Sequence, residues 1–355
     1  MKARSRLWVV EMVNVPERRR STLRDVAQKA EVSTATVSRV LNGNALVSEG
    51  TRARVQAAID ALHFVPSAAA RAINSGRTHV VGALVPTLDH EIFSRFLDAL
   101  EEELAGHGLS LVVATTKDDP DREAERAKGL VDIGVEGLIV SGVTRSPVLD
   151  ALIENRELPV VATSYFDPSY HLPTVGYDNE NAARSALRLL QESGHQAIAV
   201  YHGPTAGNDR TRARLKAFRN DPQAEFRFSA MPLDVSAASD AARRDFVEPC
   251  GTTAVLALSD VLAQGALFGL QALGIAVPGE VSVVGIDDLP SSAATTPALT
   301  TVHLPVREMG RRAATALSKW VEDGIRPSPE RLDTKVMRAS SSLAPVSGIL
   351  RGKRL

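Results

Sequence analysis

The pattern of apolar and polar positions in residues 21–62 predicts three short helices. In the first, Thr22 is placed to cap the free backbone N–H groups, Asp25 adds negative charge to the first turn, and a small apolar face begins at Val26. Ser33 is placed to cap a second helix, whose apolar residues recur at helical spacing. The side chains left on the opposite face of this second helix are Thr34, Ala35, Ser38 and Arg39.

The third helix is predicted from Thr51 to Leu62, where apolar residues follow the i, i+3, i+4, i+7 spacing of an amphipathic helix, after the turn sequence at 42–44. Three such helices fit either a DNA-reading helix-turn-helix or a plain three-helix bundle. The charge favours DNA. Residues 1–77 hold 13 Lys and Arg against 6 Asp and Glu, whereas the rest of the chain is net acidic. A basic segment attracts phosphate backbones.

From His79 onward, short runs rich in β-branched residues alternate with helical segments. The runs predicted to be buried parallel strands are 79–86, 109–116, 136–142, 158–164, 196–203, 253–259 and 281–287. The helices between them are predicted near 92–107, 120–134, 146–154, 179–193, 210–219, 236–247 and 259–273. Two such series predict two doubly wound sheets, and the short connections indicate several chain crossings between them.

Length and composition are consistent with this division. A chain of 355 residues is long enough for a small headpiece and a body of about two domains. The single Cys250 excludes an intramolecular disulfide, which is typical of the cytoplasm, and no run approaches the about 20 apolar residues of a transmembrane helix. Glu11 interrupts the first apolar run, so residues 1–20 are expected to be a flexible extension and not a signal peptide.

The runs TLRDVAQKAEVSTATVSRVLNG and ALHFVPSAAARAINSGRT resemble the headpiece and hinge of the LacI/GalR family of bacterial transcription regulators, and the resemblance covers nearly all of the chain. It implies an N-terminal all-α helix-turn-helix headpiece followed by an α/β body like a periplasmic binding protein, with two doubly wound parallel-sheet subdomains. The expected parts are an extension (1–20), the headpiece (21–66), a hinge helix (67–76), an effector-binding and dimerisation domain (77–345) and a flexible tail (346–355).

In that family the headpiece reads the major groove, and the hinge helix forms on DNA and inserts side chains into the minor groove. The residues of this chain expected to contact DNA are Thr22, Ser33, Thr34, Ala35, Thr36, Ser38, Arg39, Asn42, Thr51, Arg52, Ala70 and Ile73. Two positions depart from the family pattern. Glu31 stands where a turn glycine is common, and Ile73 stands where the hinge usually has leucine, whose shape is different from that of a β-branched side chain.

Ligands of doubly wound sheets bind beyond the carboxyl ends of the strands, and the resemblance assigns effector contacts there. The residues expected to bind the effector are Phe93, Ser164, Arg214, Ser259 and Asp287. Many sugar-responsive members of the family carry an aspartate at the position of Ser164. Two alternatives remain open: Arg214 is a surface residue beside Arg210 and Arg212, and Asp260 is a helix cap and not a ligand.

The resulting hypothesis is a transcriptional repressor that binds a palindromic operator as a homodimer, with its affinity controlled by a small polar effector such as a sugar or sugar acid. A dimer is expected because the tail lacks the leucine heptads of tetrameric members. The alternative is a solute-binding protein or an enzyme that uses the α/β body alone. No cofactor or metal is expected, since no glycine-rich phosphate motif, HExxH or CxxC occurs. The adjacent acids Asp118-Asp119 and Asp287-Asp288 should point apart.

Overall fold

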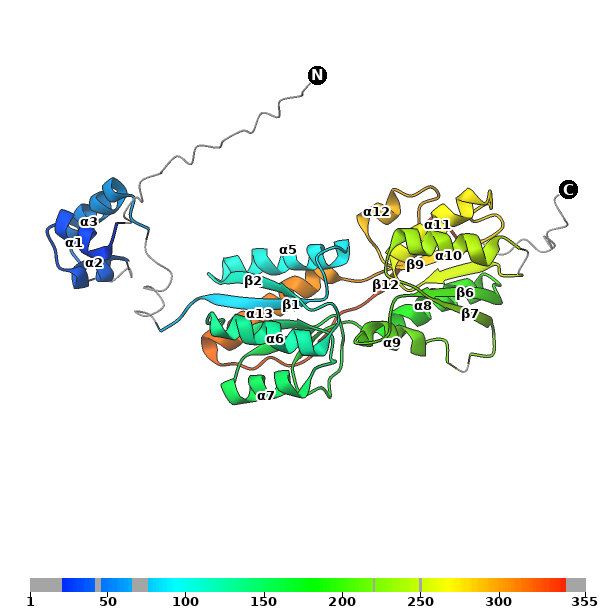
Figure 1. Cartoon of the computed structure of the whole chain (residues 1–355), viewed down its shortest axis with the longest axis horizontal. Coiled ribbons are helices and arrows are strands. Elements are labelled where there is room, and N and C mark those ends of the chain that lie inside the picture. Colours follow the sequence, from blue (N-terminus) through cyan, green and yellow to red (C-terminus); the bar gives the residue numbers. More distant parts are fainter. Residues whose placement is uncertain (1–20, 42–45, 66–75, 220, 249–250, 343–355) are drawn as a thin grey trace, which may run out of the picture. The chain divides into compact units, whose positions relative to one another are not determined.

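The structure is a computed structural model that describes residues 21–41, 46–65, 76–219, 221–248 and 251–342. The chain forms two compact units, which divide between Thr78 and His79 (Figure 1). The N-terminal unit contains α1 (Leu23–Lys29), α2 (Thr34–Leu41) and α3 (Glu49–Leu62). Val26, Val37 and Val55 are fully buried in its own small core, which confirms the three predicted apolar faces.

Side-chain caps begin all three helices. Thr22 and Asp25 form a capping box in which each side chain bonds the backbone N–H of the other. The Ser33 hydroxyl accepts the N–H of Thr36 at 3.1 Å. The third helix begins two residues before the predicted start because Ser48 caps it.

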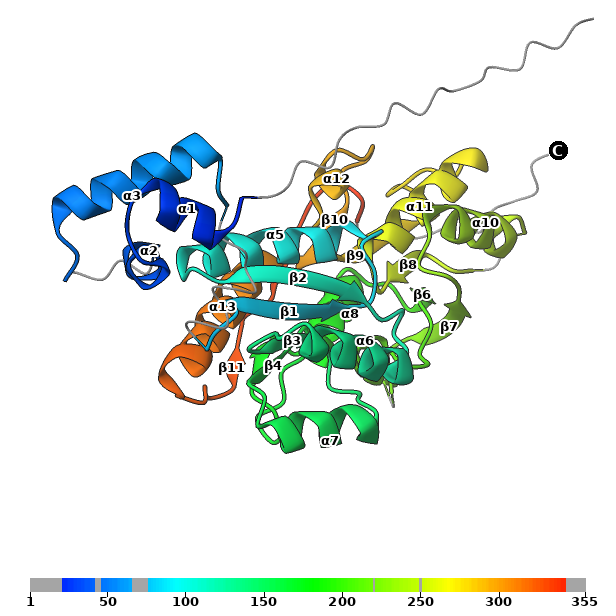
Figure 2. The same ribbon diagram turned by 60° about the vertical axis from the view of Figure 1, so that its left-hand side comes forward.

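The body holds two sheets. The first has the strand order β11-β5-β4-β3-β1-β2, and all its strands are parallel. Its strands are β1 (Val80–Val85), β2 (Ser110–Thr115), β3 (Leu138–Ser141), β4 (Val160–Thr163), β5 (Thr174–Gly176) and β11 (Glu330–Arg331). Helices α5 (Glu91–Gly106) and α13 (Val306–Asp323) cover one face, and α6 (Pro120–Asp132) and α7 (Pro147–Arg156) cover the other (Figure 2). These elements form the first subdomain.

The second sheet has the order β12-β10-β9-β8-β6-β7, and only β12 runs antiparallel to its neighbour. Its strands are β6 (Ala197–His202), β7 (Glu225–Ala230), β8 (Ala254–Ala257), β9 (Ser282–Asp287), β10 (Thr300–His303) and β12 (Lys335–Met337). Its helices are α8 (Asn179–Glu192), α9 (Asp209–Lys216), α10 (Val235–Phe246), α11 (Asp260–Ala272) and the short α12 (Pro290–Ala293). Helices α10 and α11 pack on one face, and α8 packs on the other. These elements form the second subdomain.

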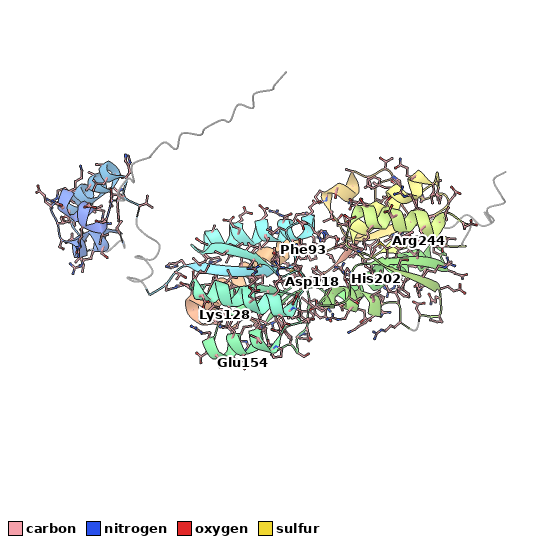
Figure 3. All side chains as sticks on the ribbon, viewed as in Figure 1. Phe93, Asp118, Lys128, Glu154, His202 and Arg244 are labelled. Atoms are coloured by element: carbon pink, nitrogen blue, oxygen red, sulfur yellow. The ribbon has the colours of Figure 1, made fainter. Side chains whose placement is uncertain are left out.

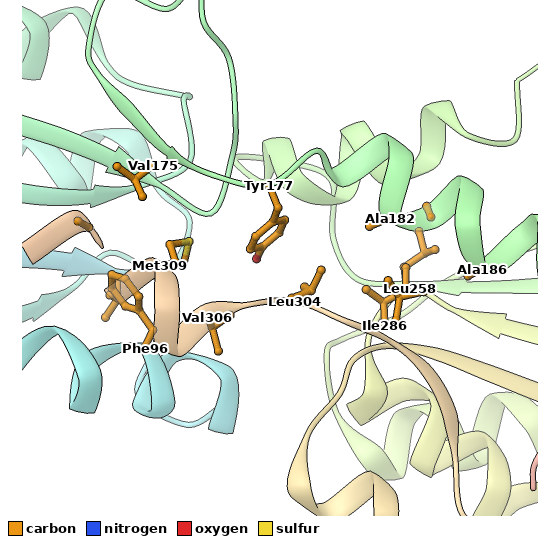
Figure 4. Packing of buried hydrophobic residues seen from close by; sticks show 14 of the residues in the cluster. Phe96, Val175, Tyr177, Ala182, Ala186, Leu258, Ile286, Leu304, Val306 and Met309 are labelled. Carbon is orange, nitrogen blue, oxygen red and sulfur yellow. The ribbon is translucent and has the colours of Figure 1, made fainter. Parts of the chain in front are cut away.

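The chain crosses between the two subdomains three times within the described residues, after β5, after β10 and after β11. Tyr177, Leu304 and Val306 lie at the first two crossings and are buried. Figure 4 shows them between the apolar residues of the two sheets, and they belong to one cluster that includes both. The prediction of several crossings is confirmed.

All seven predicted strands and seven predicted body helices occur, with ends shifted by at most three residues. The prediction that 109–116 is a buried strand was wrong, because β2 is the edge of its sheet and Val113 is 36% exposed. Five strands were not predicted. They are β5, β7, β10, β11 and β12, of which three have only two or three residues. Strands this short carry no readable alternation of apolar and polar residues.

Candidate functional site

A cavity of about 370 Å³ lies between the two subdomains. Residues that directly follow strands of both sheets line it, as expected for doubly wound folds: Pro86 follows β1, Ser164 follows β4, Gly203 follows β6 and Asp287 ends β9. Figure 3 labels two of the residues that line the cavity, Phe93 and Asp118 of the first subdomain, and it labels His202 in the second subdomain. All five residues predicted to bind the effector line this cavity: Phe93, Ser164, Arg214, Ser259 and Asp287.

Arg214 is buried, so the alternative that it is a surface residue was wrong. Its Nε donates to the side-chain oxygen of Asn179 at 3.1 Å, and one of its terminal nitrogens donates to the carbonyl of Leu258 at 2.5 Å. The same nitrogen lies 3.8 Å from a carboxylate oxygen of Asp287. The guanidinium is therefore held in a fixed orientation at the cavity wall.

Asp287 supplies the carboxylate beside Arg214. Its second oxygen accepts the Ser259 hydroxyl at 2.9 Å and the backbone N–H of Asp260 at 3.2 Å. Burial raises the pKa of the Asp287 carboxyl to about 7, although Arg214 acts in the opposite direction. A carboxyl with this pKa exchanges a proton near neutral pH, so its charge responds to what occupies the cavity.

Ser164 and Asn179 connect the two subdomains beside Arg214. The Asn179 amide nitrogen donates to the carbonyl of Ser164 at 2.9 Å, while its oxygen accepts from Arg214. Ser164 has a left-handed backbone with φ of 65°, which is uncommon for a residue with a Cβ. Because Asn179 is buried and lies at the start of α8, next to the first chain crossing, it joins the two halves of the cavity.

Asp260 is neither a helix cap nor a cavity residue. Ser259 is the N-cap of α11, and Asp260 is its first helical residue. The Asp260 carboxylate accepts hydrogen bonds from Thr301, Ser292 and the backbone of Leu289 beneath the cavity wall. The prediction that it caps the helix was wrong by one residue, because the serine before it has the extended backbone of a cap.

Most of the residues that line the cavity were not predicted, among them Asp118, Tyr177 and Arg210. Arg210 was considered only as a surface residue, yet it is 8% exposed and donates to Asp118 at 2.6 Å. Asp118 and Asp119 point apart as predicted, since Asp119 caps α6. The signal for Arg210 was present in the sequence: it lies four residues before Arg214, and so on the same side of a helix.

Aromatic side chains also line the cavity. Phe93 and Phe96 of α5 line it together with Tyr177, and the ring of His90 stacks on Phe93 with centroids 6.5 Å apart. Burial raises the pKa of the Tyr177 hydroxyl, so Tyr177 stays neutral. A cavity lined by aromatic rings as well as charged and hydroxyl groups fits a ligand that has both apolar and polar surfaces.

The N-terminal unit presents the residues predicted to contact DNA. Ser33, Thr34, Ala35 and Arg39 are exposed along one side of α2 and its cap, and Ser38 is half-buried. Arg39 makes no hydrogen bond or ion pair with any residue that the structure describes. Its guanidinium is thus available to a partner.

The other predicted DNA contacts differ in their surroundings. The hydroxyls of Thr22, Thr36 and Thr51 are engaged with the caps, bonding Asp25, Ser33 and Ser48 respectively. Arg52 is half-buried. Three further candidates lie outside the described residues: Asn42, Ala70 and Ile73. So do Cys250, the hinge helix except for Gly76, and the predicted N-terminal extension and C-terminal tail.

Two family models match the chain. One, described as bacterial regulatory proteins, lacI family, matches residues 22–67, and the other, a periplasmic binding protein-like domain, matches residues 171–341. The HTH-type transcriptional repressor CytR of Escherichia coli is 32% identical, over 82% of this chain and 87% of its own length. The catabolite control protein A of Streptococcus mutans is 31% identical, over 84% of this chain and 90% of its own length. The chain belongs to the LacI family of bacterial regulatory proteins.

This LacI family member is also similar to solved structures. A LacI family regulator from Silicibacter pomeroyi superposes with a TM-score of 0.82 at 26% identity, covering 90% of this chain and 99% of its own. The lac repressor dimer bound to operator and the anti-inducer ONPF superposes with a TM-score of 0.83 at 25% identity, covering 92% of this chain and 100% of its own.

The family determines the class of function. The protein is a DNA-binding transcriptional regulator and not an enzyme, because its family is one of bacterial regulatory proteins and its relatives include HTH-type transcriptional repressors. Among the described residues, no group of three or more His, Cys, Asp and Glu is arranged to hold a metal ion. Every helix in the described ranges is too short or too polar to cross a membrane.

Proposed function

We propose that this LacI family member is a cytoplasmic repressor that binds a palindromic operator as a homodimer, and that a sugar or sugar acid in the cavity between its subdomains controls operator affinity. The observation that carries the effector part is the cavity itself. Its polar residues come from both subdomains, so a ligand that bonds to them contacts both halves of the body.

The DNA part rests on the exposed side of α2. Thr34 and Arg39 present a hydroxyl and a guanidinium, the groups that bond base edges in the major groove. One headpiece of this size makes too few base contacts for specificity in a genome, and two copies related by a two-fold axis read a palindrome. The lac repressor in the similar operator complex is a dimer.

The effector class follows from the donors and acceptors of the cavity. Arg214 and Asp287 offer a cation and an anion 3.8 Å apart, and the Ser259 hydroxyl lies beside them. Vicinal hydroxyls of a sugar bond such a pair, one as acceptor and one as donor. A carboxylate would bind Arg214 when Asp287 holds its proton, which its raised pKa of about 7 allows. A related regulator, CelR, has been solved as a complex with cellobiose and superposes with a TM-score of 0.64 at 29% identity.

Control of DNA affinity follows if the ligand-bound and ligand-free bodies differ in the angle between subdomains. That difference would change how well the two headpieces of a dimer fit the operator. Coupling of this kind is typically worth about 1–3 kcal/mol, or a 5- to 150-fold change in operator affinity.

A thermal-shift screen of sugars, sugar acids and nucleosides tests the effector class, since a ligand at 100 times its Kd stabilises a protein by about 2.7 kcal/mol. An operator selected from random DNA is then titrated by fluorescence anisotropy with and without the strongest hit. We expect a sugar or sugar acid to stabilise the protein and to change operator affinity at least fivefold. A screen in which only nucleosides stabilise it would refute the effector class, and a selected site without two-fold symmetry would refute the palindrome.

A further inference from the structure

The start of α9, in the second subdomain, is bonded to a loop of the first subdomain. Asp209 is the first residue of α9 and is 6% exposed. One of its carboxylate oxygens accepts the backbone N–H groups of Val143 at 2.5 Å and Thr144 at 2.8 Å. Two amides that converge on one carboxylate oxygen form an anion-binding nest, here built by one subdomain for an acid of the other.

The backbone of the loop is arranged for this contact. Gly142 has φ of 75°, and a Cβ at this position would lie 2.5 Å from the Asp209 carboxylate. Glycine therefore permits both the left-handed turn and the close approach. Arg145 donates to the carbonyls of Ser141, Gly142 and Thr144, which turns the carbonyls toward Arg145 and leaves the amides for Asp209.

Buried charges of alternating sign extend from this nest in both directions. Glu123 lies 3.3 Å from Arg145, and both side chains are almost fully buried. On the other side, Arg210 lies 3.6 Å from the second oxygen of Asp209 and 2.6 Å from Asp118. The line of charges therefore ends at Asp118 and Arg210, which face the cavity.

The opposite side of the cleft is held less firmly. There, Arg95 donates to the carbonyl of Asp288 at 3.2 Å, and Ser291 donates to Glu91 at 3.2 Å across an exposed contact. On the α9 side, Asp209, Arg210 and Arg212 all bond the first subdomain. The contact at Asp209 places a buried carboxylate on two backbone donors of the other subdomain, and hydrogen bonds to a charged group are among the stronger ones.

We propose that Asp209 is a latch: its carboxylate, seated in the amide nest of Gly142–Thr144, holds the two subdomains in the closed arrangement without any effector. When the subdomains separate, water replaces the contact between the nest amides and the carboxylate. The difference in free energy between the closed and open arrangements therefore includes the strength of this contact and of the contacts beside it. Because Arg210 belongs both to the latch and to the cavity wall, a ligand that bonds Arg210 acts directly on closure. The latch does not depend on which effector binds.

Single-molecule energy transfer in the full-length protein tests the latch. The dyes are attached at Val148→Cys on α7 and Arg219→Cys after α9, both exposed positions on different subdomains, in a Cys250→Ser background. Labelled chains are mixed with excess unlabelled chains, so that each signal reports one chain. The variants are Asp209→Ala, Asp209→Asn and Gly142→Ala. The matched control is Asp240→Ala, an exposed acid of the same subdomain whose ion pair among the described residues is with Arg243.

The ligand-free parent should populate the closed distance. Asp209→Ala should raise the ratio of open to closed molecules at least about tenfold, since it removes two hydrogen bonds to a charged group. Gly142→Ala should also raise the ratio of open to closed molecules, although it leaves the carboxylate in place. The ratio for Asp209→Asn should lie between those of the parent and Asp209→Ala. Asp240→Ala should match the parent.

Distance distributions equal to the parent's in both Asp209→Ala and Gly142→Ala would overturn the proposal. Circular dichroism establishes that each variant is folded. If Asp209→Ala does not fold, the comparison of Asp209→Asn with Asp240→Ala decides, because asparagine has the same shape as aspartate and loses only the charge and one acceptor.

Discussion

Arg214 and Asp287 place opposite charges 3.8 Å apart at the wall of the cavity, one from α9 and the other from the end of β9. Both side chains are at least nine-tenths buried. A buried pair of this kind loses much of its attraction to desolvation and contributes little to stability on balance. The pair instead presents its polar groups to a ligand in the cavity. The first two predictions concern this pair.

Arg214→Ala should abolish the effector response and leave operator affinity within a few-fold of wild type. The headpiece has its own core, so the substitution does not reach the DNA-reading helix. The measurement is calorimetric titration of the effector found by the screen, alongside anisotropy with operator DNA. Lys216→Ala, at an exposed position of the same helix, is the control. Wild-type effector affinity in Arg214→Ala would refute the assigned role.

Asp287 should make effector binding and stability depend on pH near neutrality. Its pKa is raised from 3.8 to about 7, so the folded protein keeps a proton that the unfolded chain releases. The stability from this proton is fully present below pH 3.8 and is lost as the pH rises through about 7. Glu123, whose pKa burial also raises to about 7, contributes with the same sign.

In Asp287→Asn, the decline of unfolding free energy between pH 5 and pH 8 should therefore be smaller than in the wild type. Urea unfolding at a series of pH values measures this decline. Glu123→Gln serves as a second variant that reduces the same decline without touching the cavity. Parallel pH profiles for wild type and Asp287→Asn would show that Asp287 does not hold a proton in the folded state.

Arg39→Ala should weaken specific operator binding by about 1–3 kcal/mol and leave binding to random DNA within a few-fold, as expected for a base contact in the major groove. Titration of operator and random DNA at the same salt concentration separates the contribution of base contacts from that of phosphate contacts. Arg54→Ala, an exposed arginine of α3, is the comparison. Equal losses on operator and random DNA would reassign Arg39 to a phosphate.

Glu31→Gly should stabilise the headpiece by about 0.5–1 kcal/mol, because Glu31 has a left-handed backbone with φ of 54° that glycine adopts without steric cost. Glu31→Ala, which keeps a Cβ, should give no such gain. The measurement is hydrogen exchange of the amides of α1 and α2 in the full-length protein. In Glu31→Gly these amides should exchange about two- to fivefold more slowly than in the wild type, which is the factor that corresponds to that free energy. Equal exchange in both variants would mean that the turn is not strained.

The sequence predicted the headpiece well because its signals are local. Thr22, Ser33 and the apolar residues after each one lie within a single turn of the helix they begin. Seven strands of the body were predictable from their β-branched runs, although β10, which is also buried and β-branched, was missed. Strands β11 and β12 were not predicted, because segments of two or three residues become strands only by pairing with distant residues. The partner of β11 lies over a hundred positions earlier in the chain, and the partner of β12 lies about thirty positions earlier.

The cavity was predicted in part for a similar reason. Arg214 and Asp287 were placed by the family resemblance, but Arg210 was not, although the two arginines are one helical turn apart on α9. The partner that draws Arg210 inward is Asp118, which lies 92 residues earlier in the chain. No local pattern predicts such a pair, and the roles of all these residues toward DNA and effector stay predictions.

The three chain crossings also govern the order in which the protein assembles during synthesis. Both sheets are incomplete until β11 and β12 join them, and Ser341 still has to bond Thr300 and Val283 after that. The body therefore finishes folding only when nearly all of it has left the ribosome, whereas the headpiece, closed by its own core, folds much earlier. A nascent chain would display a folded DNA-reading domain before any cavity exists to regulate it.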